Sequence, residues 1–334
     1  MSTSMHSRRQ FILRAASTGT ALLATGADHN SWAQSAVDQL RILVGFGPGS
    51  FPDTVSRIVA EQLGAGYAHR GLVINRTGAA GLIAVNALLS APADGSTVLL
   101  AQGSLASAYP YLYSKLPFDP TRDLKSVTLA AETALGLAVG PTVPASVQDV
   151  RQLLAWMHEN PKLANVASPG VGTPPHLLES MLFGKSGLDW EHIAFAGGPP
   201  AVAALLGGQV AALILPEGLL RVHRAAGKLR VLATSGGQRS SFLADVPTFV
   251  EQGRPELVVA DWFAFFMSGK TSDAVVDATA RKLQAALARP ELIATFAENS
   301  TLAVSSTPAA MASRIASEQG FWAPVIRSND IRIE

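Results

Sequence analysis

The 334-residue sequence contains no cysteine, and only 15% of its residues are charged and 7% aromatic. The absence of cysteine excludes disulfides, thiolate metal sites, redox motifs and thiol nucleophiles. It fits an oxidising compartment, where an unpaired thiol is a liability and a chain of this size needs no covalent staples. Apolar residues make up 48% of the chain, so the sequence predicts a large core beneath a surface of modest charge.

Neither sign of charge is in excess. The chain has 26 basic and 25 acidic residues, which gives a formal net charge of +1 at pH 7. A basic surplus is what recruits nucleic acid or an anionic membrane surface. We therefore expect no nucleic-acid partner and no electrostatic membrane attachment.

The sequence also lacks an apolar run long enough to span a bilayer, which needs roughly 20 residues. The uncharged stretch 193–216 is interrupted by two pairs of glycines and a pair of prolines, so each piece is too short. The first 35 residues have the order of an export signal. A twin arginine, Arg8-Arg9, precedes a mildly apolar stretch, and small residues follow around 33–36. We expect residues 1–35 to be a twin-arginine-type signal peptide and the protein to be periplasmic.

After this segment, strand-like and helix-like patterns alternate. Short apolar runs at 40–44 and 98–101 are typical of buried strands, whereas the apolar spacing over 53–63 is helical. The pattern restarts near 135, and three helices are predicted at 274–288, 290–299 and 308–320. This order predicts an α/β fold in which mostly parallel sheets carry helices on both faces.

No long linker separates the two series of elements, so we expect two lobes joined by crossing strands. The predicted lobe I comprises 36–137 and 257–334, and the predicted lobe II comprises 138–256. A hinge between such lobes would let them close on a small molecule.

Three glycine-rich loops, 45–53, 168–176 and 195–200, follow predicted strands. Ligands of open α/β sheets bind at such positions, where helix N-termini present unpaired N–H groups and favour anions. Each loop is also compatible with an ordinary strand-to-helix turn. His176 in the second loop is either a ligand-facing donor or a structural residue.

Motifs for catalysis are missing. The sequence has no Gly-x-Ser-x-Gly elbow and no His-Glu-x-x-His, and its histidines show no metal-ligand spacing. We therefore expect a binding protein with no enzymatic activity, no metal and no cofactor. The rival hypothesis is an NADP-dependent reductase, suggested by the first glycine loop and Arg76. Its dinucleotide fingerprint is incomplete, because Ser50 or Pro52 stands where the third glycine belongs.

A series of short motifs occurs in a fixed order along the chain. Among them are Asn75-Arg76-Thr77-Gly78-Ala79-Ala80-Gly81, Ser168-Pro169-Gly170-Val171-Gly172-Thr173-Pro174-Pro175-His176 and Leu205-Leu206-Gly207-Gly208-Gln209. Together they resemble the Bug receptors, the substrate-binding subunits of tripartite tricarboxylate transporters. The resemblance runs from Leu40 to about Trp322.

The resemblance implies a two-lobed Venus-flytrap fold that binds a small carboxylate between its lobes. It implies a monomer that delivers its ligand to the membrane subunits of such a transporter; a sensor that presents the ligand to a signalling partner is the alternative. The loops and strand ends expected to bind the ligand contribute Phe46, Gly49, Ser50, Phe51, Asp53, Gln102, Gly103, Ser104, Ser168, Gly170, Gly172, Thr173, His176, Phe195 and Gly197.

Departures from the family pattern suggest the kind of ligand. Where the family usually has Tyr-Lys-Gly, this chain has Phe195-Ala196-Gly197, and Glu132 stands where small polar residues are usual. Helix N-termini supply only about half a positive charge each, so little offsets several ligand charges once the lysine is lost. We therefore expect a monocarboxylate with an apolar body, covered by Phe46, Phe51 and Phe195, rather than citrate.

Overall fold

The structure, a computed structural model, describes residues 37–63 and 68–333. The predicted signal peptide, residues 1–35, lies outside the described residues. Residues Ala36–Glu334 form one compact unit. Within the described ranges, no helix combines the length and the apolar character that crossing a membrane requires.

Two β-sheets organise this unit. In chain order its strands are β1 (Val37–Val44), β2 (Ala68–Asn75), β3 (Thr97–Gln102), β4 (Leu124–Val139), β5 (Asn165–Ser168), β6 (Glu191–Ala194), β7 (Ala212–Pro216), β8 (Arg230–Thr234), β9 (Ala260–Ser268) and β10 (Leu302–Ala303). The strand order is β2-β1-β3-β9-β4-β7-β5-β6, with β8 and β10 also paired to β4.

The helices connect and cover these strands. They are α1 (Phe51–Gln62), α2 (Leu82–Leu89), α3 (Ser104–Ser107), α4 (Tyr109–Leu112), α5 (Pro120–Asp123), α6 (Val150–Glu159), α7 (Pro174–Phe183), α8 (Gly198–Leu206), α9 (Glu217–Ala225), α10 (Asp273–Leu287), α11 (Pro290–Glu298) and α12 (Pro308–Ser328), with short 3-10 turns η2 (Ala79–Gly81), η3 (Pro161–Leu163) and η4 (Pro255–Leu257).

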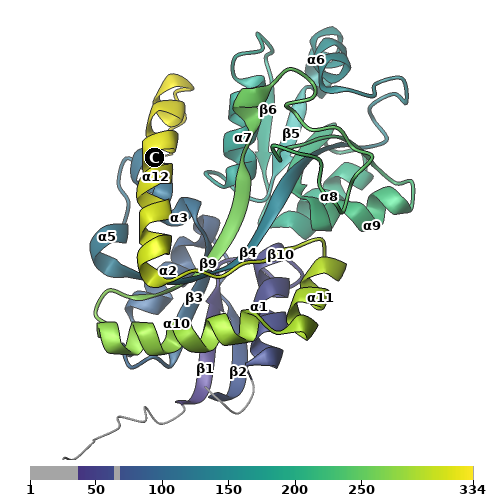
Figure 1. Cartoon of the computed structure of the whole chain (residues 1–334). Helices are drawn as coiled ribbons and strands as arrows, with labels where there is room; N and C mark the ends of the chain where they lie inside the picture. Colours follow the sequence, from purple (N-terminus) through teal and green to yellow (C-terminus); the bar gives the residue numbers. More distant parts are fainter. Residues whose placement is uncertain (1–36, 64–67, 334) are drawn as a thin grey trace, which may run out of the picture. The chain divides into compact units, whose positions relative to one another are not determined.

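Strand β4 belongs to both sheets. Its first part, Leu124–Ala134, pairs antiparallel with β9, and its last part, Leu135–Val139, pairs antiparallel with β7 and β8. Figure 1 shows β4 and β9 side by side between the two groups of helices. From the sequence, the second series of elements was expected to start only near 135, because the earlier residues include Lys125 and Glu132 and do not form a continuous apolar run.

The outer strands pair as the βα order predicted. Strand β1 is parallel to β2 and β3, and β5 is parallel to β6 and β7. The pairs around β4 and β9 are antiparallel, because these strands carry the chain out of the first sheet and back into it. The result is a mixed α/β fold with two sheets, and the carboxyl ends of β1 and β5 both lead into glycine-rich loops.

Three apolar clusters hold the layers together. One packs α1, α10 and α11 against the first sheet through residues such as Val59, Leu283 and Phe296. A second packs α8 and α9 against the other sheet. The third contains side chains of both sheets, among them Leu99 and Leu137. Burying a side chain of this size contributes about 1.5 to 3 kcal/mol, so the shared cluster stabilises the two sheets jointly.

Helix boundaries follow local signals. Asp149 caps α6 by accepting a hydrogen bond from Gln152 N, and the helix accordingly starts at Val150. Helix α12 extends past the predicted end at Gly320 to Ser328, even though Pro324 lies inside it. Trp322 and Ile326 on this extension are buried in the shared cluster, and their burial offsets the backbone hydrogen bond that a proline removes.

Candidate functional site

A cavity lies where the starts of three helices meet strand β9. It is lined by residues from the beginnings of α1, α7 and α8, from the end of β7 and from β9, and its volume is about 30 Å³. Its lining residues are Phe46, Ser50, Phe51, Pro52, Gln102, Pro169, Thr173, Pro174, Pro175, Gly198, Leu215, Pro216, Leu219, Asp261 and Phe263. We call this space the inter-sheet cavity, because it has walls from both sheets.

A larger hollow, about 780 Å³, lies between α10 and α12, but none of the glycine-rich loops lines it. The inter-sheet cavity is the hollow in which the expected binding loops converge. About 30 Å³ holds only a few water molecules, so an organic ligand would require the walls to separate.

The three helix starts favour an anion in this cavity. The first three N–H groups of each helix have no partner inside the helix, and the helix dipole adds partial positive charge. The first three positions of α1, α7 and α8 are nine residues in all. Five of them are proline, which has no N–H: Pro52, Pro174, Pro175, Pro199 and Pro200. Of the four positions that keep an N–H group, Phe51 and Gly198 line the cavity, whereas Asp53 and His176 do not. This set suits one carboxylate better than several.

Most of the cavity wall is apolar. Phe46 and Phe51 are buried, and the ring of Phe51 packs against that of Phe263 with a centroid distance of 5.0 Å. Leu215 and Leu219 add aliphatic surface from the second sheet and α9. Phe195, expected in this wall, is only half-buried and does not line the cavity. Its place is taken by Phe263, which was not expected at the site from the sequence.

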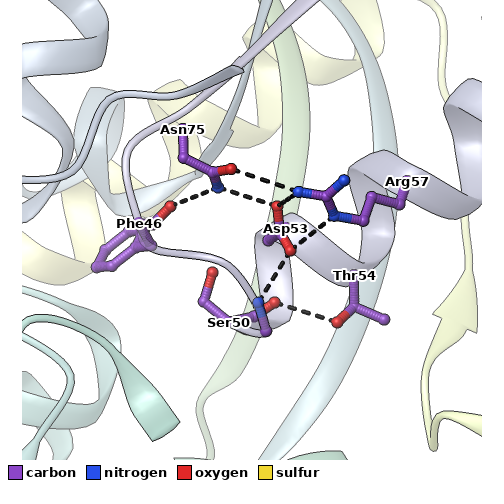
Figure 2. A network of polar contacts seen from close by, with 7 residues as sticks. Phe46, Ser50, Asp53, Thr54, Arg57 and Asn75 are labelled. Atoms are coloured by element: carbon purple, nitrogen blue, oxygen red, sulfur yellow. Dashed lines mark hydrogen bonds and ion pairs between the residues drawn. The ribbon is translucent and has the colours of Figure 1, made fainter. Parts of the chain in front are cut away.

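The first loop is held by a polar network around Asp53, shown in Figure 2. Asp53 accepts hydrogen bonds from Gly49 N at 2.9 Å, from the Arg57 guanidinium at 2.9 and 3.0 Å and from Asn75 Nδ2 at 2.9 Å. Asn75 Nδ2 also donates to Phe46 O at 2.8 Å. Burial alone would raise the pKa of Asp53, but these hydrogen bonds outweigh it and lower the pKa. Asp53 and Gly49 therefore shape the loop and do not line the cavity.

Ser50 differs from its neighbours because its hydroxyl is free. It is 2% exposed, it is the N-cap residue of α1, and it makes no side-chain capping bond. Among the described residues its Oγ has no hydrogen-bond partner. A buried hydroxyl without a partner costs about 1 to 3 kcal/mol, which a ligand oxygen in the cavity would recover.

The second loop rests on a buried histidine pair. His176 Nδ1 accepts a hydrogen bond from Gly172 N at 3.1 Å, and its ring stacks on that of His192 at a centroid distance of 4.0 Å. Burial lowers the pKa of His176 to about 3 and that of His192 to about 4. His176 is thus neutral at ordinary pH and supports the loop from behind, as the structural alternative for this residue predicted.

The remaining loop residues are also scaffold. Ser168 Oγ accepts from Gly170 N at 3.2 Å and lies 2.7 Å from His192 Nε2, and Thr173 Oγ1 donates to Gly170 O at 2.7 Å. Thr173 itself lines the cavity, whereas Ser168, Gly170, Gly172 and Gly197 do not.

At the end of β3 only the first of the three expected residues lines the inter-sheet cavity. Gln102 does so, and its Nε2 donates to Tyr109 Oη at 2.9 Å. Gly103 and Ser104 line a separate hollow next to α12.

The acid in the inter-sheet cavity is Asp261, not Glu132. Glu132 accepts a hydrogen bond from Arg314 at 2.7 Å and lines a different hollow. Asp261 was not expected at the site, because β9 was not recognised as a strand from the sequence. A usable signal was present, since Asp261 is the single charged residue in the otherwise apolar run 257–267.

Comparisons with known proteins give one consistent result. A family model described as the tripartite tricarboxylate transporter family receptor matches residues 55–331. The protein BugT of Bordetella pertussis is 30% identical over 296 residues, which cover 88% of this chain and 90% of BugT.

Two solved structures have a similar fold. The periplasmic binding protein BugD superposes with a TM-score of 0.81 at 24% identity, covering 89% of this chain and 99% of BugD. R. palustris Rpa4515, solved with adipate, superposes with a TM-score of 0.82 at 23% identity, covering 88% of this chain and 98% of that structure. These neighbours have the fold of a two-lobed periplasmic binding protein.

Proposed function

This chain belongs to the tripartite tricarboxylate transporter receptor family, and from that membership we propose that it captures a small carboxylate in the inter-sheet cavity. The observation that carries the proposal is the convergence of three helix starts, from α1, α7 and α8, on one cavity with walls from both sheets. Free N–H groups and helix dipoles at that point favour an anion. The family is one of solute-binding receptors, and we propose a receptor role without enzymatic activity.

We propose that residues 1–35 direct export and that the protein works in the periplasm. There it would act as a monomer and deliver its ligand to the membrane subunits of a tripartite tricarboxylate-type transporter. Lobes formed by 36–137 with 257–334 and by 138–256 would close on the ligand by bending along the segments that connect them, which include β4 and β9.

The cavity chemistry favours a ligand with one carboxylate and an apolar body. Adipate in the neighbouring R. palustris structure has two carboxylates. In this chain the prolines reduce the number of free N–H donors, and Phe46, Phe51 and Phe263 offer apolar contact. A second or third carboxylate would find no cation among the lining residues. Benzoate-like and phenylalkanoic acids therefore fit better than citrate.

Calorimetric titration of the purified protein with benzoate, 3-phenylpropanoate, adipate, malate and citrate tests the proposal. A monocarboxylate should bind, and a ligand at 100 times its Kd should stabilise the native state by about 2.7 kcal/mol. Absence of binding across this panel and across amino-acid analogues of its members, or turnover of any member, would refute the receptor assignment. Tight citrate binding without any monocarboxylate binding would refute only the proposed ligand type.

Ser50→Ala provides a variant that separates binding from folding. The Ser50 hydroxyl makes no hydrogen bond within the described chain, so its removal should not lower the melting temperature and should raise it by a few degrees, because the cost of burying an unpaired group is relieved. If it contacts the bound carboxylate, affinity should fall about 10-fold, the equivalent of one hydrogen bond. The matched control is Ser56→Ala, which removes another buried and unpartnered hydroxyl on α1 that does not line the cavity.

A further inference from the structure

Asp261 is a buried carboxyl group that the described chain does not satisfy. It is 2% exposed and lies on β9 opposite Thr133 of β4. Its Oδ1 has no hydrogen-bond partner within residues 37–63 and 68–333. Leaving a carboxyl group buried without a partner is costly, and such groups usually bind a cation or become neutral. Asp261 Oδ1 can therefore accept a hydrogen bond that no group of the described chain donates.

The position of Asp261 connects it to ligand space. It lines the inter-sheet cavity and also a second hollow of about 180 Å³ beside α12, which we call the α12 pocket. Pro174, at the start of α7, lines both as well. Among the described residues, Asp261 is thus the one ionisable side chain that lines both the proposed carboxylate site and the α12 pocket.

No cation is directed at Asp261 from the surrounding elements. The charged groups near it are Glu132 of β4 and Glu318 and Arg314 of α12. Arg314 donates to both glutamates, at 2.7 and 3.3 Å, and its guanidinium lies 4.7 Å from the centroid of the Trp262 ring. Burial, with a further contribution from Glu318 and Glu132, raises the pKa of Asp261 well above its ordinary value.

The α12 pocket has the chemistry of an ammonium site. Trp262, Phe321 and Trp322 line it together with Glu318, and Ser104 contributes a buried hydroxyl without a partner in the described chain. Aromatic rings and carboxylates together attract organic cations through cation–π and ionic interactions. Ser104 Oγ and Asp261 Oδ1 are acceptors that an N–H donor could satisfy.

We propose that Asp261 is a specificity-determining residue that binds an ammonium group of the ligand, while the carboxylate of the same ligand lies at the helix starts. This inference rests on the proposed receptor function and narrows the ligand to an amino-carboxylic acid with an apolar body. The ammonium group gives Asp261 its counter-ion and donates the hydrogen bonds that Oδ1 lacks. Since the empty site favours the protonated acid, binding of the ammonium group releases a proton from Asp261 to the solvent.

Matched ligand pairs test this proposal on the unaltered protein. Each pair differs only by the ammonium group: phenylalanine and 3-phenylpropanoate, 6-aminohexanoate and hexanoate, 4-(aminomethyl)benzoate and 4-methylbenzoate. In at least one pair the amino member should bind at least 10-fold more tightly. Titration in buffers of different ionisation enthalpy should show proton release on binding of that member. Equal affinity in every pair, or preference for the members without nitrogen, overturns the proposal.

Asp261→Asn then identifies the group responsible. It should weaken binding of the preferred amino acid at least 10-fold and leave the affinity of its nitrogen-free partner within about 3-fold. Glu132→Gln is the matched control: Glu132 is paired with Arg314 and lies outside both hollows, so the discrimination should persist. If Asp261→Asn retains the full preference, or binding takes up a proton, Asp261 is a hydrogen-bond donor to a carboxylate and the proposal fails.

The two proposals fail differently. Binding of 3-phenylpropanoate, hexanoate or 4-methylbenzoate without any gain from the ammonium group overturns the role of Asp261 and leaves the carboxylate receptor intact. Absence of binding by both members of every pair, and by the wider carboxylate panel, overturns the receptor function together with this inference.

Discussion

Arg314 of α12 donates a 2.7 Å hydrogen bond to Glu132 of β4, and the same guanidinium lies 3.3 Å from Glu318. One cation thus neutralises part of an acidic cluster beside the inter-sheet cavity. Both side chains of the Arg314–Glu132 pair are a little more than one-quarter exposed, so the pair is only partly screened by water. The arrangement removes Glu132 from ligand contact and leaves Asp261 as the acid without a counter-ion.

Arg314→Met should therefore lower the free energy of unfolding by about 1 to 2 kcal/mol, because it leaves two glutamates close together without their cation. Urea denaturation at pH 7 measures this change. The control is Arg122→Met, which removes an exposed pair with Asp123 and should change stability by less than about 0.5 kcal/mol. Equal effects of the two substitutions would show that the acidic cluster does not depend on Arg314.

Asp53→Ala should loosen the first loop. Four donor atoms, from Gly49, Arg57 and Asn75, converge on this carboxylate, and we expect a loss of about 2 to 3 kcal/mol in stability. Ligand affinity should fall as well, because Phe46 and Ser50 lose their support. Asp53→Asn keeps a hydrogen-bond acceptor and should lose less stability than Asp53→Ala. Hydrogen exchange of the loop amides measures this effect. Unchanged protection in Asp53→Ala would show that Asp53 does not hold the first loop in place.

Gly172 should tolerate alanine far less well than Gly187. Both have a left-handed backbone, with φ of +80° and +76°, so alanine costs each about 1 to 2 kcal/mol in strain. A Cβ at Gly172 would also lie 2.9 Å from Ile333 Cδ1 and 3.3 Å from Leu112 Cδ1, whereas one at Gly187 would meet nothing within 4 Å. Thermal unfolding of the two variants isolates the steric part. Equal losses of melting temperature would mean that the side chains of Ile333 and Leu112 move aside at little cost.

The two buried histidines should contribute a loss of stability in acid. Burial lowers the pKa of His176 to about 3 and that of His192 to about 4, both below the ordinary value of 6.5. The buried acids Glu179, Glu217 and Asp261, whose pKa values burial raises, contribute to the pH dependence with the opposite sign. Each histidine binds more protons in the unfolded chain than in the native one, so the histidine contribution to the free energy of unfolding falls as the pH decreases from about 6.5 towards 4. His176→Asn keeps an acceptor for Gly172 N and should reduce this slope. Denaturation curves at pH 4.5, 5.5 and 7 measure it; an unchanged slope would mean that His176 is protonated in the native state.

Local patterns in the sequence located the loops but not the whole cavity. The glycines and prolines around Ser50 and Thr173 encode strand-to-helix turns within a few residues, and the structure brings both residues to the cavity wall. Asp261 and Phe263 reach the same wall through pairing of β9 with β3 and β4, which lie more than 100 residues earlier in the chain. Such long-range pairing has no local sequence signature.

The continuity of β4 has a consequence for how the protein unfolds. This single strand of 16 residues hydrogen-bonds to β9 and β10 in one sheet and to β7 and β8 in the other. Because β4 is part of both sheets, unfolding one sheet removes hydrogen-bond partners of β4 and weakens the other sheet. We therefore expect neither sheet to have a thermal transition of its own. Scanning calorimetry should show one peak whose van't Hoff and calorimetric enthalpies agree. A chain that we propose bends between its halves when it binds a ligand should thus be one cooperative unit when heated.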